Sequence, residues 1–125
     1  MPLRRSSIAA LMGLLGATLA MMSALHLGGI LTGRSKPFDP THAGIAEAVI
    51  GIVLAGGAIA LLRVPARERA VALAAVAFAI LGFAVGLNFT IRGGEAIDIA
   101  YHATVLPLLL LTLAALLRDR RHSMP

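Results

Sequence analysis

The side chains best able to do chemistry in this sequence are four polar residues that lie inside long apolar stretches. They are His26, Glu47, Asn88 and His102. Imidazole and carboxylate groups can bind a metal ion or pass a proton, whereas an amide serves chiefly as a hydrogen-bonding group. An ionisable side chain is costly inside a membrane, so each such position raises a functional hypothesis.

Helical spacing indicates which of these groups can meet. Asp98, Tyr101 and His102 occupy positions i, i+3 and i+4, so on a helix they form one face and can touch. Glu47 shares its helical face with small residues, among them Gly51. Because small residues mark the surfaces where membrane helices pack closely, we expect Glu47 to face the interior of a bundle.

Each candidate also has a purely structural interpretation. Asp98 fits a first-turn acid that favours the helix dipole, and Asn88 fits a hydrogen bond at a helix end. We expect His102 to be tied to a neighbour on its own helix, and His26 to make a polar contact between helices. Glu47 therefore ranks first among the functional candidates, because it is an acid on a small-residue face.

The elements that must position these residues are membrane spans. The chain of 125 residues is 58% hydrophobic with a mean hydropathy of +0.89, above the usual range of globular proteins. Four segments approach the roughly 20 apolar residues that cross a bilayer. They cover residues 8–31, 41–62, 70–91 and 96–117. We predict an all-α integral membrane four-helix bundle, up-down-up-down, forming a single transmembrane domain over residues 1–125.

The distribution of basic residues predicts the orientation of the bundle, because cytoplasmic loops retain Lys and Arg. The predicted outer side carries Arg34, Lys36 and Arg92. The remaining basic residues, on the side of both termini, are Arg4, Arg5, Arg63, Arg67, Arg69, Arg118, Arg120 and Arg121. We therefore expect a multi-pass protein of the cell membrane with both termini in the cytoplasm. The first apolar run is too long for a secretory signal and is expected to remain as a helix.

This topology places the four intramembrane polar residues at a common depth. With a rise of 1.5 Å per residue, they fall in one layer roughly 5 to 10 Å below the outer boundary. Groups that are expensive to bury must satisfy one another. We predict one connected polar cluster in the outer half, in which His102 meets Glu47 or His26.

Composition also bears on partners. The net charge of +5 lies at the ends of apolar runs, where it sets orientation, so the lipid bilayer is the expected partner and no nucleic acid is expected. The sequence has no cysteine, which excludes disulfides and thiolate sites. Small residues, including the Gly82 to Gly86 GxxxG pattern, predict close helix packing within one chain, in a homo-oligomer or in a larger membrane complex.

Three functions fit these patterns. The first is an accessory or binding protein with an outward-facing polar cluster, and the absence of a catalytic motif speaks against an enzyme. The second is a redox or metal protein in which His26, His102 and Glu47 hold a metal ion or haem. The third is a small proton- or cation-coupled transporter that uses Glu47. Few aromatic residues are present, so an aromatic-lined pocket for an organic cation is not expected.

Overall fold

The computed structural model describes the backbone of residues 4–63 and 67–122, and the side chains of residues 4–63 and 67–118. Four α-helices account for most of this chain: α1 (Arg5–Leu27), α2 (Pro40–Arg63), α3 (Glu68–Gly93) and α4 (Ala96–His122). Each is long and apolar enough to cross a membrane, counting α4 as far as Arg118. The predicted all-α fold with four candidate spans is confirmed.

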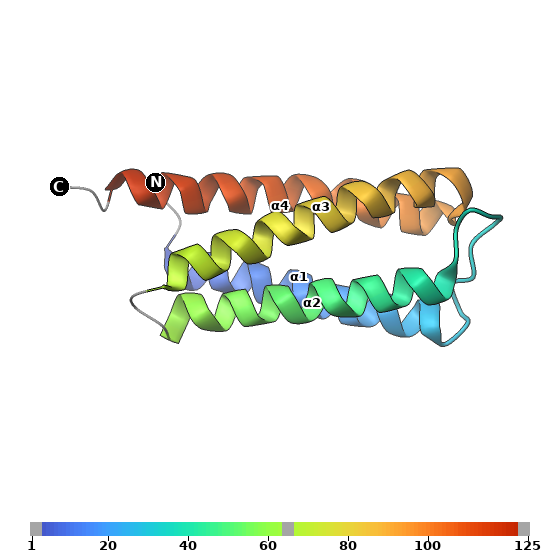
Figure 1. Ribbon diagram of the computed structural model, residues 1–125, viewed down its shortest axis with the longest axis horizontal. Coiled ribbons are helices and arrows are strands. Elements are labelled where there is room, and N and C mark those ends of the chain that lie inside the picture. Colours follow the sequence, from blue (N-terminus) through green and yellow to red (C-terminus); the bar gives the residue numbers. More distant parts are fainter. Residues whose placement is uncertain (1–3, 64–66, 123–125) are drawn as a thin grey trace.

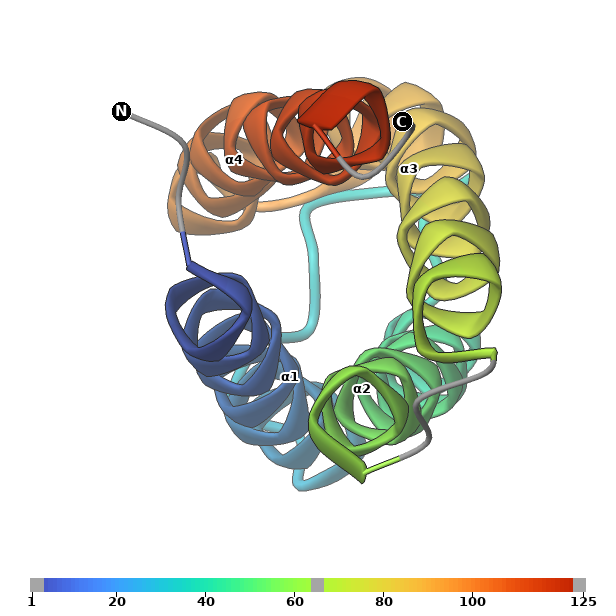
Figure 2. The ribbon, with the colours of Figure 1, turned by 90° about the vertical axis from the view of Figure 1, so that its left-hand side faces the viewer.

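The helices form a closed ring of four, each packed beside the next in the sequence (Figures 1 and 2). The packing is most extensive between α1 and α2 and least extensive between α1 and α4, which close the ring. The start of α1, the end of α2, the start of α3 and the end of α4 lie at one end of the bundle, which we call the termini end. The opposite end holds the α1–α2 loop, residues 28–39, and the turn at Gly94 and Glu95, and is called the loop end.

The first helix ends earlier than the sequence predicted. We expected the span to continue to residue 31, but α1 stops at Leu27. Gly29 adopts a positive φ of 76°, and the amide of Ile30 donates to the Leu25 carbonyl at 2.9 Å. This is a glycine-based helix stop, in which a residue without Cβ takes the left-handed conformation. The residues after it are thereby free to form the loop.

The second helix begins with a side-chain cap. Asp39 Oδ1 accepts hydrogen bonds from the amides of Thr41 at 2.8 Å and His42 at 3.3 Å. Pro40 follows at the first helical position, where no amide donor is needed. The start of α2 therefore lies within one residue of the predicted position.

The closest helix crossing joins α1 and α2. A Cβ placed on Gly16 would lie 3.1 Å from the Gly51 carbonyl oxygen, and one on Gly51 would lie 3.2 Å from the Gly16 carbonyl oxygen. Both glycines therefore let two backbones touch, as small residues do in membrane bundles. Gly82 and Gly86 act differently, because they make room for the side chains of Ile50 and His102.

The α1–α2 loop folds across the loop end of the bundle and docks on the α3–α4 turn (Figure 2). The amide of Arg34 donates to the Gly93 carbonyl at 2.7 Å. Glu95 Oε2 accepts from the amide of Thr32 at 3.1 Å. Phe38, at the end of the loop, is buried. The loop thus covers the helix ends beneath it.

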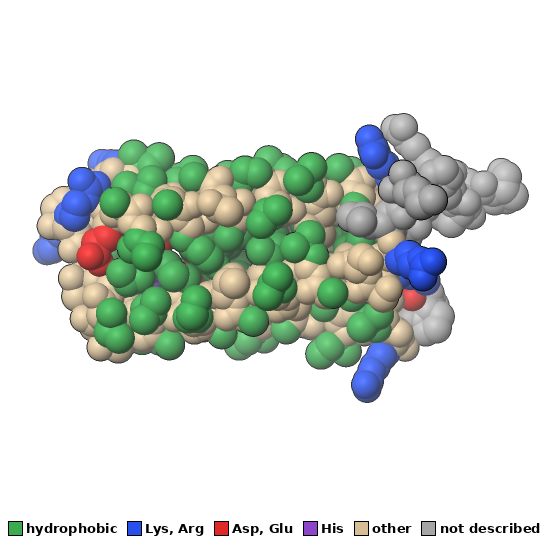
Figure 3. All heavy atoms as spheres, turned by 180° about the vertical axis from the view of Figure 1, so that it is seen from behind, with side chains coloured by type: hydrophobic (Ala, Val, Ile, Leu, Met, Phe, Trp, Pro, Cys, Tyr) green, Lys and Arg blue, Asp and Glu red, His purple; other side chains and the backbone are tan. Residues whose placement is uncertain are grey.

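The surface matches a protein surrounded by lipid. Apolar side chains cover the middle of the face seen in Figure 3, and Lys and Arg gather at its two ends. Many large apolar side chains on all four helices are exposed, including Ile52 and Leu81. Four candidate spans with such surfaces indicate a multi-pass membrane protein in contact with the bilayer. The direction in which the bundle crosses the membrane remains a prediction.

Candidate functional site

A histidine held between two carboxylates lies at the centre of the loop-end half of the bundle. His26 Nδ1 is 2.8 Å from Glu47 Oε1. Its other ring nitrogen, Nε2, is 2.9 Å from Asp98 Oδ2. The three residues come from α1, α2 and α4, so a single imidazole ring connects three helices.

Asp98 extends this arrangement to a second histidine. His102 Nδ1 lies 3.2 Å from Asp98 Oδ1 and 2.9 Å from the Asp98 carbonyl oxygen, one helical turn earlier. The resulting chain runs in the order Glu47, His26, Asp98, His102, and we call these four residues the polar cluster. The sequence predicted that His102 meets Glu47 or His26, whereas the contact of His102 within the polar cluster is with Asp98, which in turn contacts His26.

The polar cluster is sequestered from solvent. The residues are 1% (Asp98), 3% (His26), 4% (Glu47) and 6% (His102) exposed. Phe38 closes the cluster from the loop end, with its ring centroid 5.6 Å from that of His26. Carboxylates buried to this degree are stable only when they have partners, and the two imidazoles supply them.

Two other residues singled out in the sequence lie outside the polar cluster. Tyr101 is hydrogen-bonded by its hydroxyl to Thr18 Oγ1 at 2.9 Å, and its ring meets the ring of His102 edge-on at 5.9 Å. It therefore helps to orient His102. Asn88 is exposed on α3, away from these groups.

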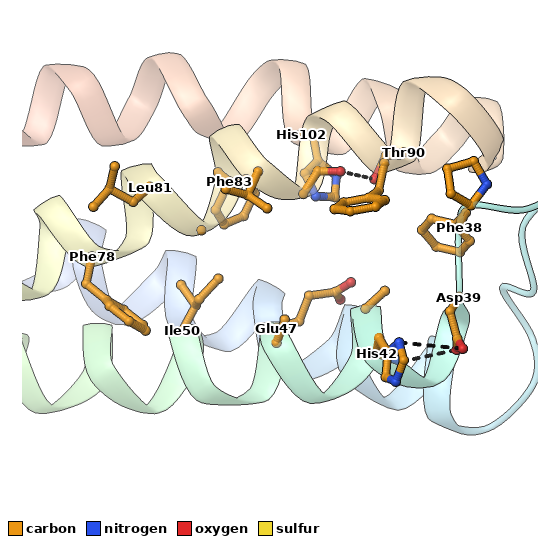
Figure 4. Close-up of a pocket in the computed structure, with 17 residues that line it drawn as sticks. Phe38, Asp39, His42, Glu47, Ile50, Phe78, Leu81, Phe83, Thr90 and His102 are labelled. Carbon is orange, nitrogen blue, oxygen red and sulfur yellow. Dashed lines mark hydrogen bonds and ion pairs between the residues drawn. The ribbon is translucent and has the colours of Figure 1, made fainter.

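A pocket of about 520 Å³ opens between α2 and α3 beside the polar cluster (Figure 4). Its walls are mostly apolar, and the end of the loop forms its rim at the loop end of the bundle. The lining residues are Pro37, Phe38, Asp39, His42, Ala43, Ala46, Glu47, Ile50, Phe78, Leu81, Gly82, Phe83, Val85, Gly86, Phe89, Thr90 and His102. This volume is typical of sites for small organic molecules.

Both ends of the polar cluster reach this pocket. Glu47 and His102 line it, whereas His26 and Asp98 lie behind them. Neither oxygen of Glu47 has a hydrogen-bond partner among the described residues, and both are buried. Oε1 still faces His26 Nδ1 at 2.8 Å, whereas Oε2 has no such contact with a described residue. On the facing side, a Cβ placed on Gly86 would lie 3.2 Å from His102 Nε2, so this glycine leaves space for the ring. The two terminal groups of the cluster are therefore the part of it that is offered to a molecule in the pocket.

The pocket also corrects an expectation. The sparse aromatic content predicted no aromatic lining, yet all four phenylalanines of the chain, Phe38, Phe78, Phe83 and Phe89, line this pocket. Phe83 is buried, with its ring centroid 5.0 Å from that of His102. Phe78 and Phe89 are partly exposed on α3, at the lipid-facing side of the opening. The amino-acid composition gives the number of aromatic residues but does not show that they lie around one pocket.

Three of the clustered residues have the geometry of a metal-binding group. One ligand atom each from His26, Glu47 and Asp98 lies within 4.8 Å of the others. The sequence had suggested His26, His102 and Glu47, so Asp98 takes the place of His102 in this set. Both nitrogens of His26 already face carboxylate oxygens, and a metal ion would have to replace one of these contacts.

The sequence underestimated two residues and missed a third. His26 was ranked below Glu47, but it is the central bridge of the cluster. Asp98 was interpreted as a helix-end acid, but it is a buried link between two histidines. Phe38 was not singled out, because its position in a polar loop gives no sign that it covers the site. Comparison with known protein families, curated proteins and solved structures finds no match.

Proposed function

We propose that this chain is a membrane binding protein that takes a small molecule into the pocket between α2 and α3. The observation that carries the proposal is the buried carboxylate of Glu47, which lines the pocket and keeps Oε2 without a partner. A buried acceptor that lacks a donor destabilises the folded state. A bound molecule that supplies the donor removes that cost.

The position of the pocket supports entry from the bilayer. Its mouth lies between two spans, and exposed apolar residues such as Leu81 and Phe89 form part of its wall. An apolar molecule dissolved in lipid can therefore reach the site without crossing the polar loop. In the orientation predicted from the basic residues, the site lies in the outer half of the membrane.

Binding accounts for the arrangement better than transport does. The pocket is lined from the loop end down to Ile50 and Phe78. Toward the termini end, the described core of the bundle is apolar, with residues such as Met12, Leu54 and Val76 almost fully buried. Thr112 is buried there, but its hydroxyl donates to the Leu108 carbonyl of its own helix at 2.7 Å. The described residues thus support a site at one depth of the bilayer.

The proposal is tested by photolabelling with a neutral probe. The purified full-length chain in lipid nanodiscs is irradiated with 4-(hydroxymethyl)benzophenone, and the labelled peptides are identified by mass spectrometry. We expect labelling of α2 and α3 residues around the pocket. Ala46→Phe should reduce this labelling about tenfold, because Ala46 is an exposed residue on the pocket wall and a ring there fills the opening.

The matched control is Ala100→Phe. Ala100 is exposed on α4 in the same half of the bundle and does not line the pocket. This variant should be labelled like the wild type. Labelling that is spread over all lipid-facing surfaces, or that is equal in Ala46→Phe and the wild type, would show that the pocket is not a binding site.

A metal site at His26, Glu47 and Asp98 is the second candidate, favoured by the closeness of their ligand atoms. Elemental analysis of the purified protein tests it directly. A stoichiometric transition metal that is lost in His26→Leu would support this candidate. Metal content no higher in the wild type than in that variant would exclude it.

A further inference from the structure

Glu47 and His102, the two members of the polar cluster that line the pocket, are both suited to accept hydrogen bonds. Glu47 Oε2 is an acceptor when the carboxylate is ionised. His102 Nδ1 faces two acceptors, the carbonyl oxygen and Oδ1 of Asp98, so this nitrogen must carry the ring proton. The other nitrogen, Nε2, is then an acceptor in the neutral ring. A bound molecule must therefore bring donors.

The charges of the polar cluster indicate the charge of that molecule. His26 has a carboxylate oxygen at each nitrogen, and a ring protonated at both positions satisfies Glu47 and Asp98 together. If the ring of His102 is neutral, one imidazolium and two carboxylates leave a net charge of −1. The part of this charge that faces neither a hydrogen-bond donor nor an ion-pair partner among the described residues is Glu47 Oε2, which is buried on a side chain that lines the pocket.

The pocket contains no basic group to balance this charge other than its histidines. None of the described residues that line it is Lys or Arg. His42, at the rim, is 3.6 Å from Asp39, the other acidic residue of the lining. A buried negative charge in a low-dielectric site favours a cation and opposes an anion. A phosphate or carboxylate head group therefore does not fit.

The remaining walls suit an apolar body with a positive end. Phe83 and Phe38 lie near the polar cluster, and Phe78 and Phe89 flank the opening. Aromatic faces attract cations and also pack against apolar groups. Ile50, Leu81 and Val85 complete the apolar surface.

We propose that the pocket binds an amphiphilic organic monocation, with a protonated amine or related donor group at Glu47 and His102 and an apolar body between α2 and α3. This assignment rests on the proposed binding function and specifies its ligand class. It follows from the juxtaposition of a buried carboxylate with one unpartnered oxygen, an acceptor imidazole and four phenylalanines around one cavity.

A series of probes with one body and different head groups tests the charge preference. The full-length chain in nanodiscs made of zwitterionic lipid is photolabelled with 4-(aminomethyl)benzophenone, 4-(hydroxymethyl)benzophenone and 4-benzoylbenzoate. These probes are respectively cationic, neutral and anionic at neutral pH. We expect half-maximal labelling of the pocket at about tenfold lower concentration for the amine than for the alcohol. The carboxylate should label the pocket least.

The variant Glu47→Gln separates charge from shape. It keeps the size of the side chain and removes its negative charge, so the preference for the amine over the alcohol should fall to about twofold or less. Glu68→Gln is the matched control, because Glu68 lies at the termini end, where it pairs with Arg5. It should retain the wild-type preference.

The outcomes separate this inference from the function on which it rests. Equal labelling of the pocket by all three probes, or a preference for the alcohol or the carboxylate, would overturn the cation assignment and leave the pocket as a binding site. A preference for the amine that Glu47→Gln leaves unchanged would also overturn it. If no probe labels the pocket, or if Ala46→Phe leaves the labelling by every probe unchanged, the binding function itself is overturned. If Glu47→Gln does not fold, the preference among probes in the wild type still decides the question.

Discussion

At the scale of single residues, His26 stabilises the buried interior at the loop end of the bundle. Its ring separates two buried carboxylates and contacts both. Without it, Glu47 would lose its only close cationic or donor partner among the described residues, while Asp98 would keep His102. A buried ion pair is weak evidence for stability, but removing one partner from it is strongly destabilising.

We therefore predict that His26→Leu lowers the free energy of unfolding by about 3 to 5 kcal/mol. The double variant His26→Leu, Glu47→Leu should recover part of this loss, because it also removes the stranded carboxylate. The measurement is far-UV circular dichroism during SDS titration in mixed micelles.

The control for this prediction is His42→Leu. The side chain of His42 is 84% exposed, so its replacement should change stability by no more than about 0.5 kcal/mol. Equal unfolding midpoints for the wild type and His26→Leu would show that the bridge contributes nothing to the fold.

At the scale of the helices, the four seams of the ring are held by different means. The α1–α2 seam depends on backbone approach at Gly16 and Gly51. The α1–α4 seam has the least packing and carries two polar links, from Thr18 to Tyr101 and from His26 to Asp98. The α2–α3 seam contains the pocket. The α2 helix therefore packs closely against α1 on one side and carries Glu47 at a cavity on the other.

The glycine crossing gives a prediction at this scale. Gly51→Leu should destabilise the bundle by about 1 to 3 kcal/mol, because its Cβ alone would lie 3.2 Å from the Gly16 carbonyl oxygen and the rest of the side chain has no space. The matched control is Gly56→Leu on the same helix, where a Cβ meets nothing within 4 Å. SDS unfolding of the two variants should differ clearly. Similar midpoints for both would contradict the close crossing.

At the scale of the whole molecule, the bundle has an apolar middle and two charged ends, as a membrane protein requires (Figure 3). The orientation follows only from the excess of Lys and Arg at the termini end. It decides whether the pocket faces the cytoplasmic or the outer half of the membrane.

A pair of matched cysteine variants tests this orientation. Ser6→Cys lies at the termini end and Ser35→Cys at the loop end, and both serines are exposed. The native chain contains no cysteine to interfere. In intact cells, a membrane-impermeant maleimide should label Ser35→Cys but not Ser6→Cys until the cells are lysed. The reverse pattern would invert the orientation and place the pocket in the cytoplasmic half.

The sequence by itself determined the class of fold and the depth of the polar residues. Four apolar runs of membrane-spanning length leave the backbone no other way to satisfy its hydrogen bonds in lipid. The antiparallel order then places His26, Glu47 and His102 in one layer, because depth depends only on the distance of a residue from a helix end. Such signals are local, so they can be obtained from the chain without its contacts.

The tertiary structure decided which of these groups touch and what surrounds them. The closing of α4 against α1 brings Asp98 to His26, and the loop that docks on the α3–α4 turn brings Phe38 over His26. The convergence of four phenylalanines depends on the loop and α3 together. These contacts join residues far apart in the chain, so helical phase cannot identify them. Phase gives only the direction of a side chain on its own helix. The partner of that side chain depends on how the helices and the loop pack.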